Sequence, residues 1–264
     1  MAIFGKLRTS TGGAVACLLV LGLAFGLASA SSAAPTFTLK TKALPIPGVT
    51  GTGDILGAGA VIQVEGKISG TEYGGYPPPL TSIRYFAPAG AKVRPQAFAS
   101  CAPAVIEQRG PEACPKKSLA GPLGSGLGVV SFGSERVPET ATVQPIFAPG
   151  GGLELFVDGN TPVSLEILAA GHVVDAAPPF SMEFMEEIPL IETVPGALDA
   201  SILEGTVRVG AAYQQGKRAV SYVTLPAKCS EGGWLVKVEL GFLGGASAQT
   251  TYNMPCPRRG RSRR

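Results

Sequence analysis

Glycine and proline interrupt this sequence so often that short strands are the main regular structure it can form. The 264 residues include 36 glycines and 23 prolines, and both residue types tend to end regular elements. The runs between them are short, and they are apolar or alternate between apolar and polar residues, which is the pattern of β-strands. No run of about a dozen residues or more has the periodicity of an amphipathic helix. The sequence therefore predicts an all-β protein.

Twelve runs have the length and pattern of strands, and they span residues 36–42, 60–67, 81–87, 127–133, 141–148, 153–159, 162–168, 181–188, 202–209, 219–225, 234–242 and 248–254. About a dozen strands in roughly 220 residues favour a two-sheet β-sandwich or a jelly-roll-like fold over a propeller. Residues 158–160 (DGN) predict a hairpin turn. We predict one sandwich domain over residues 34–257. Two smaller β domains are the alternative, because segments 85–90 (YFAPAG) and 146–151 (IFAPGG) resemble each other.

The N-terminal segment has the order of a secretory signal peptide. Lys6 and Arg8 precede an apolar run at 14–28, and small residues that signal peptidase accepts follow that run. The apolar run is shorter than the roughly 20 residues that a membrane-spanning helix needs. We predict that residues 1–33 are removed, that the protein is secreted or associated with the cell envelope, and that no membrane span is left. An uncleaved anchor and lipid attachment at Cys17 are the alternatives.

Removal of this segment would leave four cysteines, which are Cys101, Cys114, Cys229 and Cys256. An even number of cysteines in an exported protein indicates disulfides. Four cysteines allow three pairings, and we favour the two bonds between sequence neighbours, 101 with 114 and 229 with 256. The predicted strands 219–225, 234–242 and 248–254 run up, down and up, which places Cys229 and Cys256 at the same end of a sheet.

The segment between the first two cysteines predicts one short helix near residues 103–109. Pro103 suits the first helical position, and Gly110 followed by Pro111 ends the helix. A helix that returns through such a turn brings its two flanks within reach of a disulfide bond.

The basic residues are concentrated at the two ends of the chain. The whole sequence carries 22 basic and 19 acidic residues, a net charge of +3. Taking away Lys6, Arg8 and the five arginines near the C-terminus leaves 15 basic and 19 acidic residues, a net charge of −4 for the body. A mildly acidic body without basic clusters does not favour binding to nucleic acid.

The last seven residues hold five arginines, which are Arg258, Arg259, Arg261, Arg263 and Arg264. The segment 258–264 contains no apolar residue, so we predict a disordered basic tail. Two interpretations of this tail are open. It has no role, or its arginines contact anionic polymers or lipid headgroups of the envelope.

Three tyrosines lie close together in the sequence "EYGGYPPPLTSIRYF", namely Tyr73, Tyr76 and Tyr85. Exposed tyrosines on a stiff proline-rich loop suit stacking on sugar rings or on a partner protein. The alternative is that the prolines cover a sheet edge and the tyrosines pack beneath them. We therefore treat the three tyrosines as candidate ligand contacts.

The sequence predicts no catalytic site, no metal site and no cofactor. It lacks the nucleophile elbow of serine hydrolases, because Leu123 stands where that motif needs glycine before Ser125. His172 and Asp175 are three positions apart, which puts them on opposite faces of an extended strand. There is no C-x-x-C pair, and the one histidine has no partner that would make a zinc site. Glycines at alternate positions in "GSGLG" (124–128) predict a tightly packed strand or bulge rather than a phosphate-binding loop.

A run of carboxylates stands in "MEFMEEIPLIE", with Glu183, Glu186, Glu187 and Glu192. On a strand, Glu183 and Glu187 face one way and Glu186 faces the other. We interpret the run as a solvated acidic edge that discourages strand-to-strand aggregation. A calcium site and a catalytic carboxylate pair are the alternatives.

Several segments are similar to a group of uncharacterised exported β-rich proteins of high-GC Gram-positive bacteria: GTEYGGYPPPLT, SCAPAVIEQRGPEACPKKSLAGPLGSG, FAPGG, VPGA and LPAKC with YNMPCP. The similarity spans most of the chain after the N-terminal segment. It implies an exported β-rich protein, and it carries over no catalytic residues.

The expected function is that of a non-catalytic exported protein that contacts the cell envelope, a polysaccharide or another protein. Two alternatives stay open, which are an exported hydrolase with an unrecognised site and a structural envelope component without a discrete ligand. A cluster of exposed tyrosines would favour the first expectation. A deep pocket in which glutamates converge with His172 or Asp175 would favour the hydrolase.

Overall fold

The structure is a computed structural model that describes residues 34–46, 55–216 and 218–257. The predicted signal peptide at 1–33 and the predicted basic tail at 258–264 lie outside the described residues. Both therefore stay predictions.

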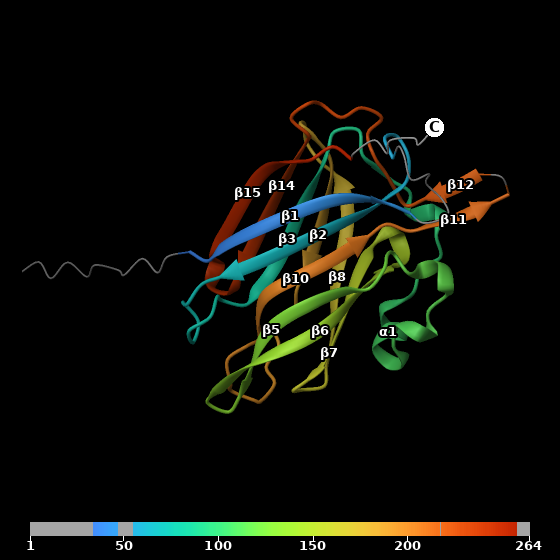
Figure 1. The fold of residues 1–264 in the computed structure, drawn as a ribbon. Coiled ribbons are helices and arrows are strands. Elements are labelled where there is room, and N and C mark those ends of the chain that lie inside the picture. Colours follow the sequence, from blue (N-terminus) through green and yellow to red (C-terminus); the bar gives the residue numbers. More distant parts are fainter. Residues whose placement is uncertain (1–33, 47–54, 217, 258–264) are drawn as a thin grey trace, which may run out of the picture. The chain divides into compact units, whose positions relative to one another are not determined.

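Eleven strands form one continuous sheet in the order β1-β2-β10-β5-β6-β7-β8-β9-β3-β14-β15 (Figure 1). Every neighbouring pair in this sheet is antiparallel. The strands are β1 (Thr36–Pro45), β2 (Ala60–Ser69), β3 (Leu80–Pro88), β5 (Gly124–Phe132), β6 (Glu135–Phe147), β7 (Leu153–Thr161), β8 (Leu165–Asp175), β9 (Phe180–Glu187), β10 (Ser201–Val209), β14 (Trp234–Phe242) and β15 (Ser247–Met254).

Short elements complete the described fold. Two small two-stranded sheets pair β11 (Ala212–Gln215) with β12 (Arg218–Ser221) and β4 (Lys92–Val93) with β13 (Val223–Thr224). The described residues form one α-helix, α1 (Pro103–Arg109). The 3-10 turns are η1 (Pro95–Ala97), η2 (Pro111–Ala113), η3 (Lys116–Ser118), η4 (Pro149–Gly151) and η5 (Leu243–Gly245).

The large sheet curls until its two edge strands, β1 and β15, meet. The Thr41 and Tyr252 hydroxyls form a hydrogen bond across this seam. Because the neighbours in the sheet of eleven strands are all antiparallel, β1 and β15 run in the same direction, and no backbone ladder joins them in the described ranges. The sheet is thus nearly barrel-like, and Figure 1 shows the two edges side by side.

The all-β class is confirmed, with one difference in how the strands are joined. A sandwich has two separate sheets, whereas here hydrogen bonding is continuous through eleven strands. The two faces that a sandwich would pack together are opposite walls of one curled sheet. Long antiparallel sheets twist, and a strongly twisted sheet of this size tends to curl.

Glycines on the inner face help the sheet to curl. Gly205 on β10 pairs with Gly66 on β2 and with Gly126 on β5, so three adjacent strands lack a side chain in one row. Glycine within a strand marks bends and close backbone approach. At Gly124 a β-carbon would collide with the carbonyl oxygen of Thr206. The glycine-rich segment is therefore part of a tightly packed strand, as the sequence predicted.

The two predicted disulfides and the predicted short helix are confirmed. Cys101 bonds to Cys114 and Cys229 bonds to Cys256, with Cα–Cα distances of 5.4 and 5.9 Å. Helix α1 spans 103–109 as expected and buries Ile106. Ile106 packs with the first disulfide against the outer side of β6 and β7, through Ile146 and Phe156.

Two local expectations are wrong. The hairpin turn was expected at 158–160, but these residues continue β7, and the turn to β8 follows Thr161. The run 219–225 splits between β12 and β13 and does not pair with β14, whose second neighbour is β3. Cys229 and Cys256 are close because β14 and β15 form a hairpin, and the loop before β14 lies beside the end of β15.

Candidate functional site

The inner face of the curled sheet lines a partly open apolar cavity of about 200 Å³. Its lining comes from strands β1, β2, β3, β4, β7, β9, β10, β13, β14 and β15. Because side chains alternate along a strand, one face of each strand points inward. These inward side chains are almost all aliphatic or aromatic, for example Phe37, Ile83, Phe184, Val207 and Leu240.

The cavity owes part of its space to missing side chains. Gly66 and Gly205 both line it, and a β-carbon at Gly205 would meet no atom within 4 Å. Protein interiors are normally filled to the density of organic crystals. An unfilled apolar space beside these glycines is therefore unusual for a protein interior, and it is large enough to hold a small ligand.

One acidic side chain, Glu186 on β9, faces this apolar interior. It follows Met182 and Phe184 on the same face of the strand, and all three line the cavity. Glu186 is 7% exposed, and its carboxyl lies where a side chain at Gly171 of the neighbouring strand β8 would lie. Its Oε2 has no hydrogen-bond partner among the described residues.

Burial governs the charge state of Glu186. Loss of hydration raises the pKa of Glu186 to about 9, and the negative charge of Glu154 raises it further in the same direction. The Glu186 side chain is therefore a neutral carboxylic acid at neutral pH. A neutral acid has one O–H donor, which an ionised carboxylate lacks.

Two further buried oxygens near Glu186 are unpaired. The hydroxyl of Tyr222, a fully buried residue, has no hydrogen-bond partner within the described ranges. Burial raises the pKa of Tyr222, and the charge of Glu186 adds to this effect. Glu154 on β7 also has an unpaired Oε2, and burial raises its pKa. Glu154 alternates with Leu153 and Leu155, which line the cavity, so it faces the other side of the sheet.

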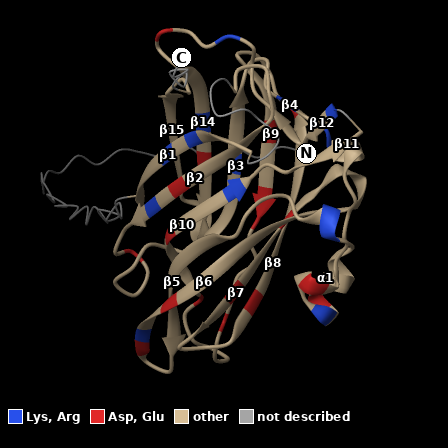
Figure 2. Ribbon diagram, turned by 45° about the vertical axis from the view of Figure 1, so that its right-hand side comes forward, with Lys and Arg blue, Asp and Glu red and all other residues tan. Residues whose placement is uncertain are grey.

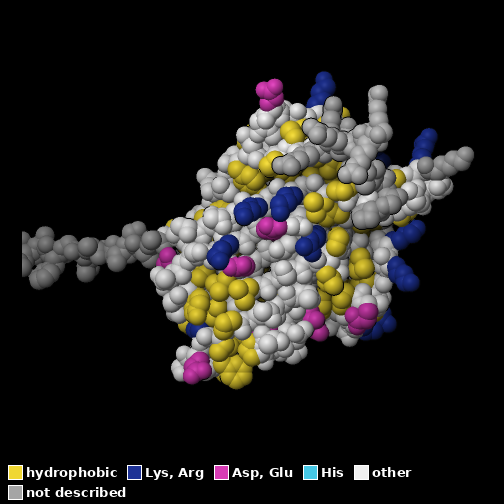
Figure 3. Space-filling model, viewed as in Figure 1, with side chains coloured by type: hydrophobic (Ala, Val, Ile, Leu, Met, Phe, Trp, Pro, Cys, Tyr) yellow, Lys and Arg dark blue, Asp and Glu magenta, His cyan; other side chains and the backbone are white. Residues whose placement is uncertain are grey.

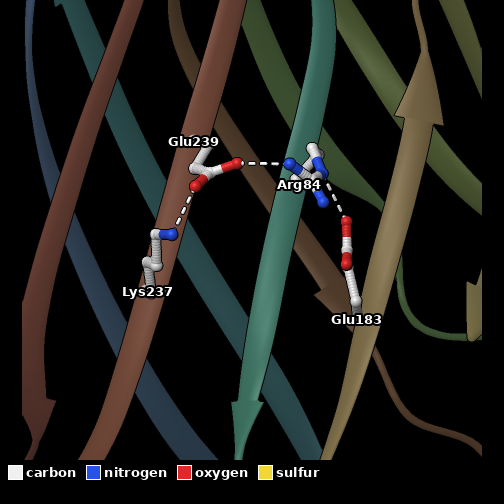
Figure 4. Close-up of polar contacts among 4 residues, drawn as sticks. All are labelled: Arg84, Glu183, Lys237 and Glu239. Atoms are coloured by element: carbon white, nitrogen blue, oxygen red, sulfur yellow. Dashed lines mark hydrogen bonds and ion pairs between the residues drawn. The ribbon is translucent and has the colours of Figure 1, made fainter. Parts of the chain in front are cut away.

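A charged network crosses the outer face of β14, β3 and β9 (Figure 4). Arg84 donates hydrogen bonds to Glu183 and to Glu239, the latter over 2.6 Å, and Lys237 pairs with Glu239. The contact with Glu183 raises the pKa of Arg84, and the hydrogen bond from Lys237 lowers the pKa of Glu239. These pairs hold the Glu183 carboxylate, which is only 8% exposed, in a charge-balanced setting.

The interpretation of the glutamate run as a solvated edge is wrong. Strand β9 lies inside the sheet, between β8 and β3. Glu183 and Glu186 are buried, whereas Glu187 and Glu192 are exposed. The expectation that Glu186 faces away from Glu183 is confirmed. In the described parts of the chain, no three His, Cys, Asp or Glu side chains come together as a metal site.

The structure separates the three candidate tyrosines. Tyr73 and Tyr76 lie in the loop between β2 and β3, with the Arg136 guanidinium 5.6 and 5.4 Å from their ring centroids. The Tyr73 hydroxyl also accepts a hydrogen bond from the Asp199 N–H over 3.2 Å. Tyr85, in contrast, lines the cavity and contacts Phe184 edge to face.

The residues considered for hydrolysis do not converge. Ser125 lies on β5, whereas His172 and Asp175 lie on β8, and all three are exposed. Strands β6 and β7 separate β5 from β8. Glu186 and Glu204 are the glutamates that line the cavity, and neither His172 nor Asp175 lines it.

A shallower groove of about 360 Å³ lies on the outer face of β1, β2, β10 and β5. Gly66, Gly126 and Gly205 form part of its floor, and Lys40, Glu65, Lys67 and Glu204 stand on it. Figure 3 shows the basic and acidic side chains mixed on this face, and Figure 2 shows that charges of both signs are spread along the strands. The Lys67 ammonium pairs with Glu204 over 2.5 Å, while Lys42 pairs with Glu65 over 3.3 Å.

None of the helices in the described ranges has both the length and the hydropathy that crossing a membrane requires. Comparisons of the chain with protein-family models, with curated proteins and with solved structures find no match.

Proposed function

We propose that this protein is an exported, non-catalytic binding protein that holds a small apolar molecule inside its curled sheet. The observation that carries the proposal is the apolar cavity of about 200 Å³. An engineered protein cavity of roughly 150 Å³ stays dry and binds benzene, so this volume suits a molecule of roughly eight to ten non-hydrogen atoms. Barrels of about eight strands are wide enough to hold one small ligand.

Export is supported by the two disulfides. Such bonds persist in oxidising compartments and are rare in reducing ones. A carrier of apolar molecules is useful in an aqueous space outside the cytoplasm, because its ligand is poorly soluble there.

The seam between β1 and β15 is the part of the wall that supports ligand exchange best. Elsewhere, opening the sheet breaks a backbone ladder, whereas this seam is held by side-chain contacts such as the Thr41–Tyr252 hydrogen bond. Phe37 and Leu39 of β1 and Met254 of β15 line the cavity at this seam. A ligand that passes between the two strands reaches the apolar interior directly.

Filling the cavity should weaken binding. A leucine at Gly205 would project into open space, so we expect Gly205→Leu to fold and to lower the affinity for isopropylbenzene by roughly tenfold or more. The matched control is Thr206→Leu, which adds a similar side chain to the opposite face of β10. Calorimetric titration measures both affinities, and thermal unfolding measures both stabilities. Equal affinities of wild type and Gly205→Leu, or no binding to wild type, would contradict the proposal.

A second candidate function is contact with a polymer of the cell envelope, and the charged outer groove favours it. Lys40, Lys67, Glu65 and Glu204 would offer hydrogen bonds and charge to a polysaccharide lying over the glycine floor. The predicted arginine tail would add non-specific attraction to an anionic polymer, and such attraction falls off within a Debye length.

If this second candidate function is right, the protein should sediment together with isolated cell-wall polysaccharide. Truncation after Pro257 should weaken the association if the tail carries it, and the double variant Lys40→Gln, Lys67→Gln should weaken it if the groove does. Added sodium chloride should weaken either kind of contact, because exposed charges are screened. Association that survives both changes and ignores salt would argue against both surfaces.

A further inference from the structure

We propose that Glu186 is the polar anchor of the cavity, and that its neutral carboxyl group donates a hydrogen bond to one uncharged oxygen of the ligand. The ligand class is then a small apolar molecule with a single carbonyl or hydroxyl group, in preference to a hydrocarbon or a carboxylate. This inference rests on the proposed function and names the ligand class of the same site.

The position of Glu186 carries the inference. It shares the inward face of β9 with Met182 and Phe184 and lines the cavity. At 7% exposure it is withdrawn from solvent, yet Oε2 has no hydrogen-bond partner among the described residues. A buried polar atom without a partner costs roughly 1–3 kcal/mol. A ligand oxygen at this point would offset that cost, which a hydrocarbon cannot do.

The surroundings of Glu186 favour an uncharged partner. Burial raises the pKa of Glu186 to about 9, so it enters the interaction as a donor. The nearby titratable groups are Glu154, whose charge opposes ionisation of Glu186, and Tyr222, whose hydroxyl is unpaired. The basic residue among the cavity-lining residues, Lys67, is paired with Glu204 and 62% exposed. A carboxylate ligand would therefore lack a counter-charge in the apolar interior.

The rest of the cavity fixes how such a ligand would lie. Apart from Glu186, the side chains from β3, β9 and β14 that line the cavity are aliphatic or aromatic, or the sulfur-containing Met182. Tyr85 contributes its ring, which contacts Phe184. The oxygen of the ligand would point at β9, and its hydrocarbon part would extend toward Ile83, Val238 and Leu240 on the neighbouring strands.

Three probes of equal size test this assignment: isopropylbenzene, acetophenone and benzoate. They share a phenyl ring and the same number of non-hydrogen atoms, and they differ in the group that would meet Glu186. Each probe is titrated into wild type and into two variants. Glu186→Met removes the donor, and Glu186→Gln keeps an N–H donor of similar size. Calorimetric titration at neutral pH gives each affinity.

We expect Glu186→Met to lower the affinity for acetophenone roughly fivefold to tenfold relative to the affinity for isopropylbenzene, because one hydrogen bond is lost. Glu186→Gln should keep the wild-type preference, and benzoate should bind far more weakly than acetophenone. In wild type, the carbonyl stretch of bound acetophenone should lie at a lower frequency than in a hydrocarbon solvent. This last measurement needs no variant, so it tests the anchor even if Glu186→Met fails to fold.

The outcomes separate the two proposals. If no probe binds wild type, cavity binding itself is wrong, and the anchor falls with it. If isopropylbenzene and acetophenone bind with the same ratio in wild type and Glu186→Met, the cavity proposal stands and the anchor is overturned. An unshifted carbonyl stretch also overturns the anchor. Benzoate that binds as tightly as acetophenone would overturn the assignment of an uncharged ligand.

Discussion

Raising the pH from about 5 to about 9 is expected to destabilise the folded protein through Glu186. The pKa of this carboxyl rises from an ordinary value of 4.5 to about 9 on folding, mainly because it is buried. Between these values the folded state keeps a proton that the unfolded state has released. Stability therefore falls as the pH rises, by about 1.4 kcal/mol per pH unit. Over the whole window the loss is on the order of 4–7 kcal/mol, which is comparable to the total stability of many domains.

Urea unfolding at several pH values measures this effect, with Glu186→Gln as the key comparison. The amide does not ionise, so the steep fall in stability between pH 5 and 9 should flatten in Glu186→Gln. Glu154→Gln measures the contribution of Glu154, because burial also raises the pKa of Glu154 and its effect on stability has the same sign. A wild-type stability that is flat over this window would show that Glu186 is hydrated or ionised in the folded protein.

Carboxylates with lowered pKa values do not change the stability between pH 5 and 9. Hydrogen bonds from Gln63 and from Lys237 lower the pKa values of Glu65 and Glu239, respectively. A lowered carboxylate pKa adds stability that is fully present above the ordinary value and is lost as the pH falls below it. Their contribution therefore changes under acid conditions, where Glu186 is protonated in both states. The raised and the lowered glutamate pKa values therefore affect stability in different pH ranges.

The strands were predictable from the sequence because their signals are local. Alternation within a run such as "VKVEL" at 236–240 is written in a few adjacent residues, and the structure shows β14 over 234–242 as expected. The disulfides were predictable from the expected export of the protein and from the spacing of its cysteines. In the same way, alternation on β9 predicted that Glu186 faces away from Glu183 and Glu187, and this holds in the structure.

The environment of Glu186 was not predictable, because it depends on which strands become neighbours. β9 pairs with β3, and Glu183 lies opposite Phe86, almost a hundred residues earlier in the chain. Without that pairing the glutamate run resembles an edge strand. With it, one face of β9 is covered by the apolar interior. The signal that sequence reasoning missed is the pattern Met182, Phe184, Glu186, in which one acid continues an apolar face.

The cavity was hidden for the same reason. Gly66 and Gly205 line it, and these glycines are far apart in the sequence and meet only when β2 and β10 are adjacent. Each glycine alone indicates a bulge or a close backbone approach. Their alignment on one inner face leaves space beside a row of large apolar side chains, and this becomes visible only after the strand order is known.

Removing the two disulfides is the second change with a large expected effect, and the two bonds should differ in what they protect. They close loops with sequence separations of 13 and 27 residues. The chain-entropy model assigns roughly 3 and 3.6 kcal/mol to loops of these sizes. We expect each double serine variant to lose about that much stability in urea unfolding, and thiol titration of unfolded, non-reduced mature protein to find no free cysteine. Two or more free thiols would contradict the paired state.

The location of each bond makes the test sharper than stability alone. The Cys101–Cys114 bond holds α1 over the outer side of β6 and β7, away from the cavity. Cys101→Ser with Cys114→Ser should therefore weaken folding and leave the rate of ligand release nearly unchanged. The Cys229–Cys256 bond anchors the end of β15, an edge strand of the seam. Cys229→Ser with Cys256→Ser should let that end fray and speed the release of isopropylbenzene, as stopped-flow dilution would show. Equal release rates in the two double variants would mean that ligands do not pass through the seam between β1 and β15.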